Sequence, residues 1–97
     1  MRFEWDEEKN RRNKAKHEIP FELACEVFGD PLAAGVRDRV VAGEERWQTI
    51  GSVNGLLLLV VHTYRLRGGE DDIRIISARK ANRRERKIYE EGTEFGC

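Results

Sequence analysis

The sequence is poor in the residues that cross-link or anchor small proteins. It has two cysteines, Cys25 and Cys97, and no CxxC pair or Cys/His cluster, so we expect neither a disulfide framework nor a zinc site. Its longest apolar run, from Leu56 to Val61, has six residues, whereas a membrane-spanning helix needs roughly 18. The first residues turn acidic and polar at once, unlike a secretion signal. The sequence therefore predicts a cytoplasmic protein.

The motifs of nucleotide and cofactor enzymes are also missing. No P-loop, GxGxxG or GxSxG sequence occurs. No pair of carboxylates with a neighbouring histidine indicates a magnesium or zinc nuclease site, so we expect no metal and no cofactor. If the chain cleaves a phosphodiester, this pattern favours metal-independent cleavage, in which the 2′-hydroxyl of RNA attacks its own phosphate. DNA lacks this hydroxyl and is not cut in this way.

The charge of the chain is balanced in total but not in its distribution. The 97 residues suffice for one domain, residues 1–97, and 39% of them are apolar, which is typical of a folded chain. The net charge is zero. Segment 73–88 nevertheless holds one acid, Glu85, and seven basic residues: Arg74, Arg79, Lys80, Arg83, Arg84, Arg86 and Lys87. Such a local basic cluster, rather than the total charge, decides where a polyanion binds.

The hydrophobic periodicities predict a small α+β sandwich. Two N-terminal helices, over 7–16 and 20–29, precede an antiparallel meander of about four strands, over 32–36, 45–50, 56–64 and 73–78. Residues 3–5 also fit a short strand. A C-terminal helix follows, with Asn82 as its N-cap, Glu85 in a capping box and Ile88 as its apolar anchor, and it ends at Gly92.

The end of the last predicted strand carries the clearest functional signal. Arg83 and Arg84 fall in the first turn of the C-terminal helix, where the helix dipole is unfavourable to cations unless an anion binds there. Arg79 and Lys80 stand just before it, where strand becomes helix, and we predict that they contact the scissile phosphate. The alternative interpretation is a solvated basic helix or a contact for an acidic partner.

Further candidates come from other parts of the chain. His17 and His62 can transfer protons near neutral pH, although His62, on an apolar strand, also fits a core side chain. Trp47, beside Arg46, and Tyr89 can stack on unpaired bases, with core packing as the alternative for Trp47. Three basic side chains fall on one side of the first helix and add candidate RNA contacts: Lys9, Arg12 and Lys16.

Together these residues resemble the BrnT family of bacterial toxins over about residues 3–91. The matching pieces are Phe3-Glu4-Trp5-Asp6-x-x-Lys9, Asn13, Lys16-His17, Phe21-Glu22-x-Ala24, Phe28-x-Asp30-Pro31, Gly43-Glu44-x-Arg46, Val61-His62-Thr63, Ile73-Arg74-Ile75-Ile76-Ser77-Ala78-Arg79-x-Ala81 and Glu85-Arg86-x-x-Tyr89. Two departures stand out: Glu18-Ile19-Pro20 replaces a glycine-led turn, and the Gly68-Gly69 loop is longer than the family pattern leads us to expect.

The resemblance implies a RelE-like fold and a ribonuclease activity that inhibits translation. It also implies an antitoxin, BrnA, with a ribbon-helix-helix DNA-binding part, which forms a heterotetramer with the toxin and binds operator DNA. The family's basic and polar motif positions map onto this chain at six residues, which we predict to form the catalytic site: His17, Arg46, His62, Arg79, Lys80 and Tyr89.

Three hypotheses follow from the sequence. The first is a metal-independent ribonuclease toxin. The second is a non-catalytic nucleic-acid-binding module, which would show salt-sensitive binding without a cleavage product. The third is an interaction subunit whose basic segment only receives an acidic partner.

Overall fold

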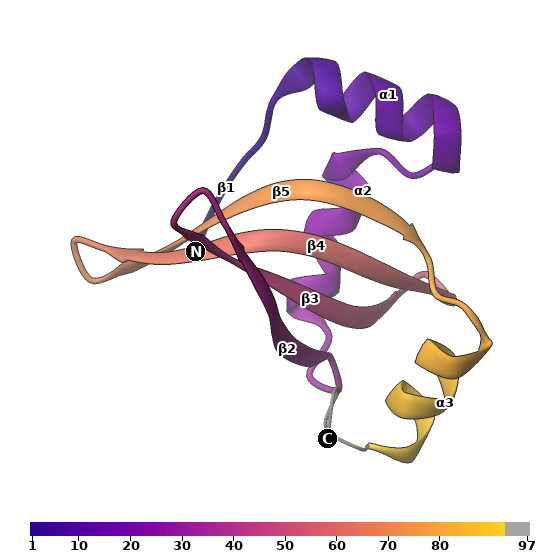
Figure 1. The fold of residues 1–97 in the computed structure, drawn as a ribbon. Coiled ribbons are helices and arrows are strands. Elements are labelled where there is room, and N and C mark those ends of the chain that lie inside the picture. The colour runs from indigo at the N-terminus through magenta and orange to yellow at the C-terminus, as the bar shows by residue number, and fades with distance from the viewer. Residues whose placement is uncertain (93–97) are drawn as a thin grey trace.

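A five-stranded sheet forms the centre of the protein in the computed structural model, which describes residues 1–92 (Figure 1). The strand order is β1-β5-β4-β3-β2. The strands are β1 (Arg2–Glu4), β2 (Ala34–Val41), β3 (Glu44–Val53), β4 (Leu56–Arg67) and β5 (Glu70–Lys80). The predicted α+β class and the antiparallel meander of β2 to β5 are confirmed. Strand β1 pairs in parallel with β5, so the sheet has five strands and is mixed.

The connection between the last two strands is shorter than the predicted strands, which end at residue 64 and begin at residue 73, leave room for. Strands β4 and β5 continue to Arg67 and from Glu70, and only Gly68 and Gly69 connect them. Both glycines have positive φ angles, 58° and 78°, which fit a two-residue hairpin turn. The three acidic residues at positions 70–72, which the predicted strands leave out, lie in β5. There Asp72 Oδ2 is 3.2 Å from Nε of Arg67.

The first helix, α1 (Glu7–His17), docks through asparagines because it has almost no apolar side chains. Asn13 Nδ2 donates to the carbonyl oxygens of Ile19 and Ala78, each at 2.8 Å, and its Oδ1 accepts the Ala78 N–H at 3.2 Å. Strand β1 pairs with β5 only at residues 72–74. Asn13 therefore takes the place of a strand partner at the free edge of β5, and Figure 1 shows α1 lying beside that strand.

The predicted second helix is divided into two shorter pieces. An α-helix, α2 (Phe21–Ala24), continues as a 3₁₀ helix, η1 (Cys25–Gly29). Phe21, Ala24 and Val27 are fully buried, at a spacing of three, and 3₁₀ geometry places such side chains on one line. Val27 packs onto Gly51 of β3, where an added Cβ would lie 2.6 Å from its Cγ1. The segment that approaches the sheet closely at Gly51 is therefore the 3₁₀ helix η1.

The run of six apolar residues from Leu56 to Val61 predicts a strand with apolar side chains on both faces, and β4 is buried on both. Leu58 and Val60 belong to the core under α2 and η1, whereas Leu57 and Leu59 belong to a smaller cluster on the other face. Helix α3 (Arg83–Glu91) covers only one end of that second face. The rest of this face has no helix over it in the described part of the chain, and we call it the open face.

The capping of α3 follows the sequence closely, but its anchor does not. Asn82 and Glu85 form the predicted capping box, and Gly92 ends the helix with a φ of 67°. Tyr89, rather than Ile88, packs against the apolar cluster of the sheet.

No helix within residues 1–92 combines the length and apolar character that a membrane crossing requires. Cys97 lies outside the described residues.

Candidate functional site

A row of arginines crosses the open face of the sheet. Arg46 on β3 lies opposite Arg39 on β2 and Thr63 on β4, and Thr63 lies opposite Arg74 on β5. Directly opposed residues point to the same face of a sheet. Arg46 also shares its face with Ile50, four residues along β3, which belongs to the apolar cluster under α3. This arginine row extends over three strand spacings, about 14 Å.

Arg46 has an unsatisfied donor at the centre of this row. Its Nε is buried and has no hydrogen-bond partner among residues 1–92. A buried donor without a partner costs about 1–3 kcal/mol. Arg46 also forms no ion pair among residues 1–92, whereas Arg39 and Arg74 are paired with Asp38 and Glu44. A phosphate would offer this guanidinium group the two parallel hydrogen bonds that arginine forms with phosphate oxygens. Arg46 is therefore the side chain whose surroundings best fit an anion.

Arg79, the strongest candidate from the sequence, is held by α3. Its Nη1 and Nη2 donate to the two carboxylate oxygens of Glu85 at 2.8 and 2.9 Å, and Nη1 also donates to the carbonyl oxygen of Lys80 at 3.2 Å. Glu85 is only 7% exposed. Burial alone raises its pKa, but hydrogen bonds from Arg79 and the Asn82 N–H, with the charges of Arg79 and Arg84, outweigh burial and lower it. Arg79 thus fastens α3 to the sheet.

The other basic residues of this segment remain accessible where β5 ends. Lys80, Arg83 and Arg84 are all exposed. They lie at the end of β5 and the start of α3, next to the ion pair of Arg79 and at one end of the open face. Their exposure is compatible both with phosphate binding and with a solvated surface.

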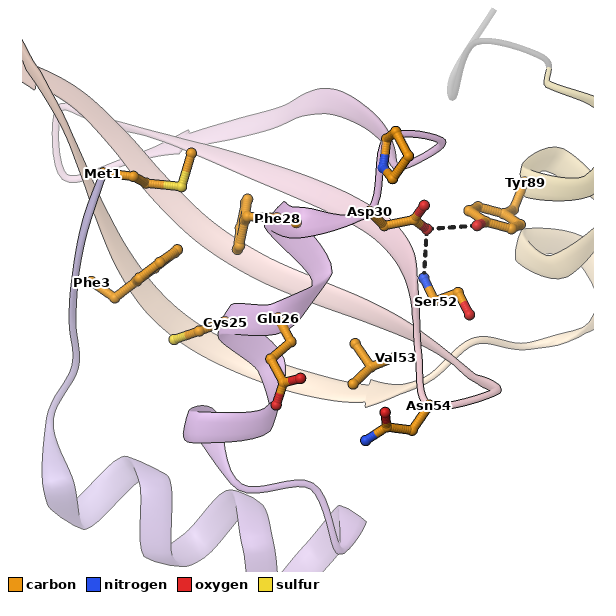
Figure 2. A pocket seen from close by; sticks show the side chains of 12 residues that line it. Met1, Phe3, Cys25, Glu26, Phe28, Asp30, Ser52, Val53, Asn54 and Tyr89 are labelled. Atoms are coloured by element: carbon orange, nitrogen blue, oxygen red, sulfur yellow. Dashed lines mark hydrogen bonds between the residues drawn. The ribbon is translucent and has the colours of Figure 1, made fainter.

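Tyr89 is engaged in a structural hydrogen bond. Its hydroxyl donates to Asp30 Oδ2 at 2.5 Å, and the same oxygen accepts the Ser52 N–H at 2.8 Å (Figure 2). The bond to Asp30 raises the pKa of Tyr89 and, from the other side, lowers the pKa of Asp30. Tyr89 therefore connects α3 to the segment after η1 and to β3, and its proton already has an acceptor.

His62 lies on the face of the sheet that the helices cover. It is 4% exposed, its Nε2 is 2.8 Å from Thr49 Oγ1, and its Nδ1 is 3.0 Å from the Thr63 carbonyl oxygen. The ring of Phe28 packs edge-on against it, with centroids 4.8 Å apart. Burial lowers the pKa of His62, opposed by the bond to Thr63. Trp47 lies opposite His62 on the same face. The structure thus separates both residues from the arginine row.

A comparison with protein families identifies the chain. Residues 5–85 match the family described as the ribonuclease toxin, BrnT, of type II toxin–antitoxin systems. This match covers most of the 97 residues. The chain belongs to the BrnT family. A search of curated proteins found no match. As a BrnT toxin, the chain has RNA as its substrate class and an antitoxin as its partner.

The α1 candidates of this BrnT chain lie apart from the arginine row. Lys9, Arg12 and Lys16 are exposed on α1, and Arg12 lies 3.5 Å from Glu8. His17 is half-buried at the C-terminal end of the helix, one turn beyond Asn13. Figure 1 shows that end of α1 on the side of the sheet where β5 finishes. The structure therefore groups these residues with the edge of β5 rather than with Arg46.

A groove of about 780 Å³ occupies a different part of the BrnT chain. Figure 2 shows it between η1, the start of the chain and the β3–β4 hairpin. Phe3 and Phe28 form its apolar wall, and Glu26 and Asp30 are its acidic groups. The described residues that line it include no lysine or arginine side chain. This groove is therefore unsuited to phosphate.

Of the arginine row, the sequence pointed only to Arg46 as a site residue. Arg39, Thr63 and Arg74 become neighbours of Arg46 only through strand register. The register shifts between Arg37 and Arg39 in one ladder, and at Val61/His62 in another. The alternation of side chains along one strand can assign Arg74 to a face of the sheet. It cannot show which residues of neighbouring strands lie opposite, because the two register shifts change that pairing.

Proposed function

We propose that this BrnT toxin cuts RNA on the open face of its RelE-like sheet, by attack of a ribose 2′-hydroxyl on the adjacent phosphate, and thereby inhibits translation. The observation that supports this most directly is the buried, unpartnered Nε–H of Arg46 within the arginine row. Cleavage of this type requires no metal ion. Residues 1–92 contain no group of three or more His, Cys, Asp or Glu side chains placed to hold one.

In this proposal the arginines stabilise charge that develops on the phosphate. Arg46 binds a non-bridging oxygen, and the fixed positive charge of Arg74 lies across Thr63 in the same row. Arg79 and Lys80 contribute positive charge from the end of β5. Arg83 and Arg84 contact flanking phosphates. The products are a 2′,3′-cyclic phosphate and a 5′-hydroxyl end.

The proposal leaves three sequence candidates outside the chemistry. His62 and Trp47 lie on the covered face, and the hydroxyl proton of Tyr89 is bound to Asp30. The remaining candidates, which lie on α1, are assigned to contacts with RNA that passes the edge of β5: Lys9, Arg12, Lys16 and His17.

We also propose that the antitoxin is a BrnA-like protein with a ribbon-helix-helix DNA-binding part. It forms a heterotetramer with the toxin and reaches operator DNA through its own domain. The support is the family membership, together with an exposed basic segment that an acidic partner can cover. Mixing the purified partners and measuring the mass of the complex by light scattering tests this arrangement. A one-to-one heterodimer would contradict it.

The activity is tested with the purified chain, an RNA oligonucleotide and its DNA counterpart, both in EDTA. We expect RNA to be cut to cyclic-phosphate products and DNA to remain intact. Arg46→Ala should lower the rate by roughly 10²- to 10³-fold. Arg37→Ala is the matched control, because Arg37 is exposed, lies opposite Trp47 on the other face and binds Glu45 at 3.2 Å. No cleavage by the wild type, or equal loss in both variants, would contradict the proposal.

The alternative is a non-catalytic nucleic-acid-binding or antitoxin-binding module. The ion pairs of Arg79 with Glu85 and of Arg74 with Glu44 favour it, because they already occupy two of the arginines. It predicts RNA binding that weakens steeply with salt and leaves the RNA uncut. The same incubation, followed by filter binding at two salt concentrations, separates the two functions.

A further inference from the structure

A carboxylate lies within the arginine cluster of the open face. Glu44 is two residues before Arg46 on β3, so the two side chains share that face. Its carboxylate forms an ion pair with Arg74 and lies 3.5 Å from Nη2 of Arg65. The Glu44 side chain retains 21% exposure. It borders a small hollow of about 40 Å³, whose lining also includes Glu4 and Thr63.

We propose that Glu44 is the general base that accepts the proton of the attacking 2′-hydroxyl. This inference rests on the proposed ribonuclease function and names a residue for it. Attack by a ribose hydroxyl needs a proton acceptor within hydrogen-bonding reach of that hydroxyl. Neither histidine of the chain supplies one on the open face, because His62 lies under η1 and His17 ends α1.

The other acidic groups of this face are less suitable. Both oxygens of Glu85 accept hydrogen bonds from Arg79. Asp72 is paired through separate oxygens with Arg2 at 2.9 Å and Arg67 at 3.2 Å, as Glu44 is with two arginines of its own. Asp72 differs in position, because it lies on β5, two strands away from Arg46. Glu4 is exposed on β1, three strands away from Arg46. Glu44 alone among these four acids is on the same strand as Arg46.

The spacing of Glu44 and Arg46 suits the reaction. Residues i and i+2 of a strand are about 6.6 Å apart along the backbone. A phosphate oxygen held by Arg46 therefore leaves the neighbouring ribose within reach of the Glu44 carboxylate. A carboxylate so close to a phosphate would normally repel it. Arg65 and Arg74, which contact Glu44 from β4 and β5, offset this repulsion.

The step balances in atoms and charge. Glu44 takes the 2′-hydroxyl proton as the 2′-oxygen forms a bond to phosphorus. The bond from phosphorus to the 5′-oxygen breaks, and that oxygen takes a proton from solvent water on the open face. Glu44 then returns its proton to solvent. Arg46 and Arg74 remain charged and stabilise the phosphorane, in which negative charge on the non-bridging oxygens is greatest.

The charged groups on the face of Glu44 come from four strands. On its own strand the nearest charged residue of this face is Arg46, and β1 contributes Glu4. Strands β4 and β5 contribute the remaining groups, which line the same hollow: Arg65, Arg67, Asp72 and Arg74. Any effect of acid on the rate has to be assigned to Glu44 by substitution, since two other carboxylates border the hollow.

The test compares Glu44→Gln, Glu44→Asp and the matched control Glu4→Gln, which removes a carboxylate from the same hollow. Single-turnover cleavage of an RNA oligonucleotide is measured against pH. Binding to the 2′-O-methyl form of the oligonucleotide and thermal unfolding are measured in parallel. We expect Glu44→Gln to cut roughly 10²- to 10⁴-fold more slowly, to lose the acidic limb of its pH–rate profile and to keep its affinity for the uncut analogue. Glu44→Asp should recover part of the rate and keep that limb, and Glu4→Gln should behave like the wild type.

Each other outcome is decisive. If Glu44→Gln cuts at the wild-type rate, or loses affinity for the analogue in proportion to its rate, Glu44 is not the base. If Glu44→Gln does not fold, the inference stands only if Glu44→Asp folds, cuts more slowly and keeps the acidic limb. A wild type that binds RNA but cuts none at any pH overturns the ribonuclease function itself. That failure is separate, because it appears without any substitution.

Discussion

Arg79 and Glu85 form a bidentate ion pair that joins the last strand to the last helix. Both terminal nitrogens of Arg79 reach both carboxylate oxygens of Glu85, and Glu85 in turn caps the N-terminus of α3 by accepting the Asn82 N–H at 2.9 Å. The residue that the sequence marks most strongly for phosphate therefore also has a structural role. Substitution of Arg79 can therefore lower activity in two ways, by loss of a phosphate contact or by loss of stability, and each needs its own measurement.

Arg79→Ala is expected to destabilise the protein as well as to impair RNA cleavage. The substitution leaves the buried Glu85 carboxylate without its main partner, which costs about 1–3 kcal/mol. Urea denaturation measures the change in the free energy of unfolding. Arg83→Ala, at an exposed position of the same helix, is the control and should stay within about 0.5 kcal/mol of the wild type. Equal stability of the two variants would show that the ion pair contributes nothing.

Tyr89→Phe should loosen α3 without removing cleavage. The substitution deletes the hydroxyl that donates to Asp30 and keeps the ring that packs against the sheet. The expected loss is about 1 kcal/mol, seen in the unfolding midpoint and in faster amide exchange within α3. Cleavage lowered 100-fold in a variant that is still folded would show that Tyr89 takes part in the reaction after all.

The stability of the fold should decrease as the pH falls below 6.5, because of His62. Burial holds the folded-state pKa of His62 below its ordinary value of 6.5, so the unfolded chain binds a proton more readily. The contribution is complete above pH 6.5 and is lost as the pH falls through the folded-state pKa. Denaturation at a series of pH values measures it. In His62→Phe this part of the pH dependence should vanish, and an unchanged profile would exclude His62 as its source.

A second acid-induced loss should follow below pH 4.5. The pKa of Glu85 lies below its ordinary 4.5, and that of Asp30 lies below its ordinary 3.8. Both contributions are present above those ordinary values and are lost as the pH falls further. Because Glu85 and Asp30 both hold α3, this loss should appear first as faster amide exchange in α3. Exchange that accelerates uniformly across the sheet would contradict that assignment.

Asn13→Ala is expected to cost about 2–4 kcal/mol, because it removes three hydrogen bonds to buried backbone groups of Ile19 and Ala78. The free edge of β5 should open, which is visible as faster exchange of the Ala78 amide. Lys14→Ala, at the exposed neighbouring position, serves as the control. A variant of unchanged stability would mean that water replaces the asparagine without loss.

Local signals predicted the elements but not the face that carries the arginine row. The capping box of Asn82 and Glu85, the end of α3 at Gly92 and the doubly buried strand at Leu57 to Val60 depend on neighbouring residues, and all were predicted. His62 was ambiguous, because alternation places it on one side of its strand without showing which side the helices cover. The conformation of Glu18 was not predictable from a local pattern either. It adopts a left-handed φ of 63° at the end of α1, where glycine is the usual residue.

The sequence by itself determined the class of fold, the basic character of residues 73–88 and the resemblance to BrnT, because these depend on composition, order and short-range spacing. Only the tertiary structure decided how the basic residues are used. Strand register placed Thr63 between Arg46 and Arg74, and packing of η1 placed His62 against Phe28. Two register shifts and the position of α3 set these relationships. They arise from contacts between residues far apart in the chain, which no local pattern encodes.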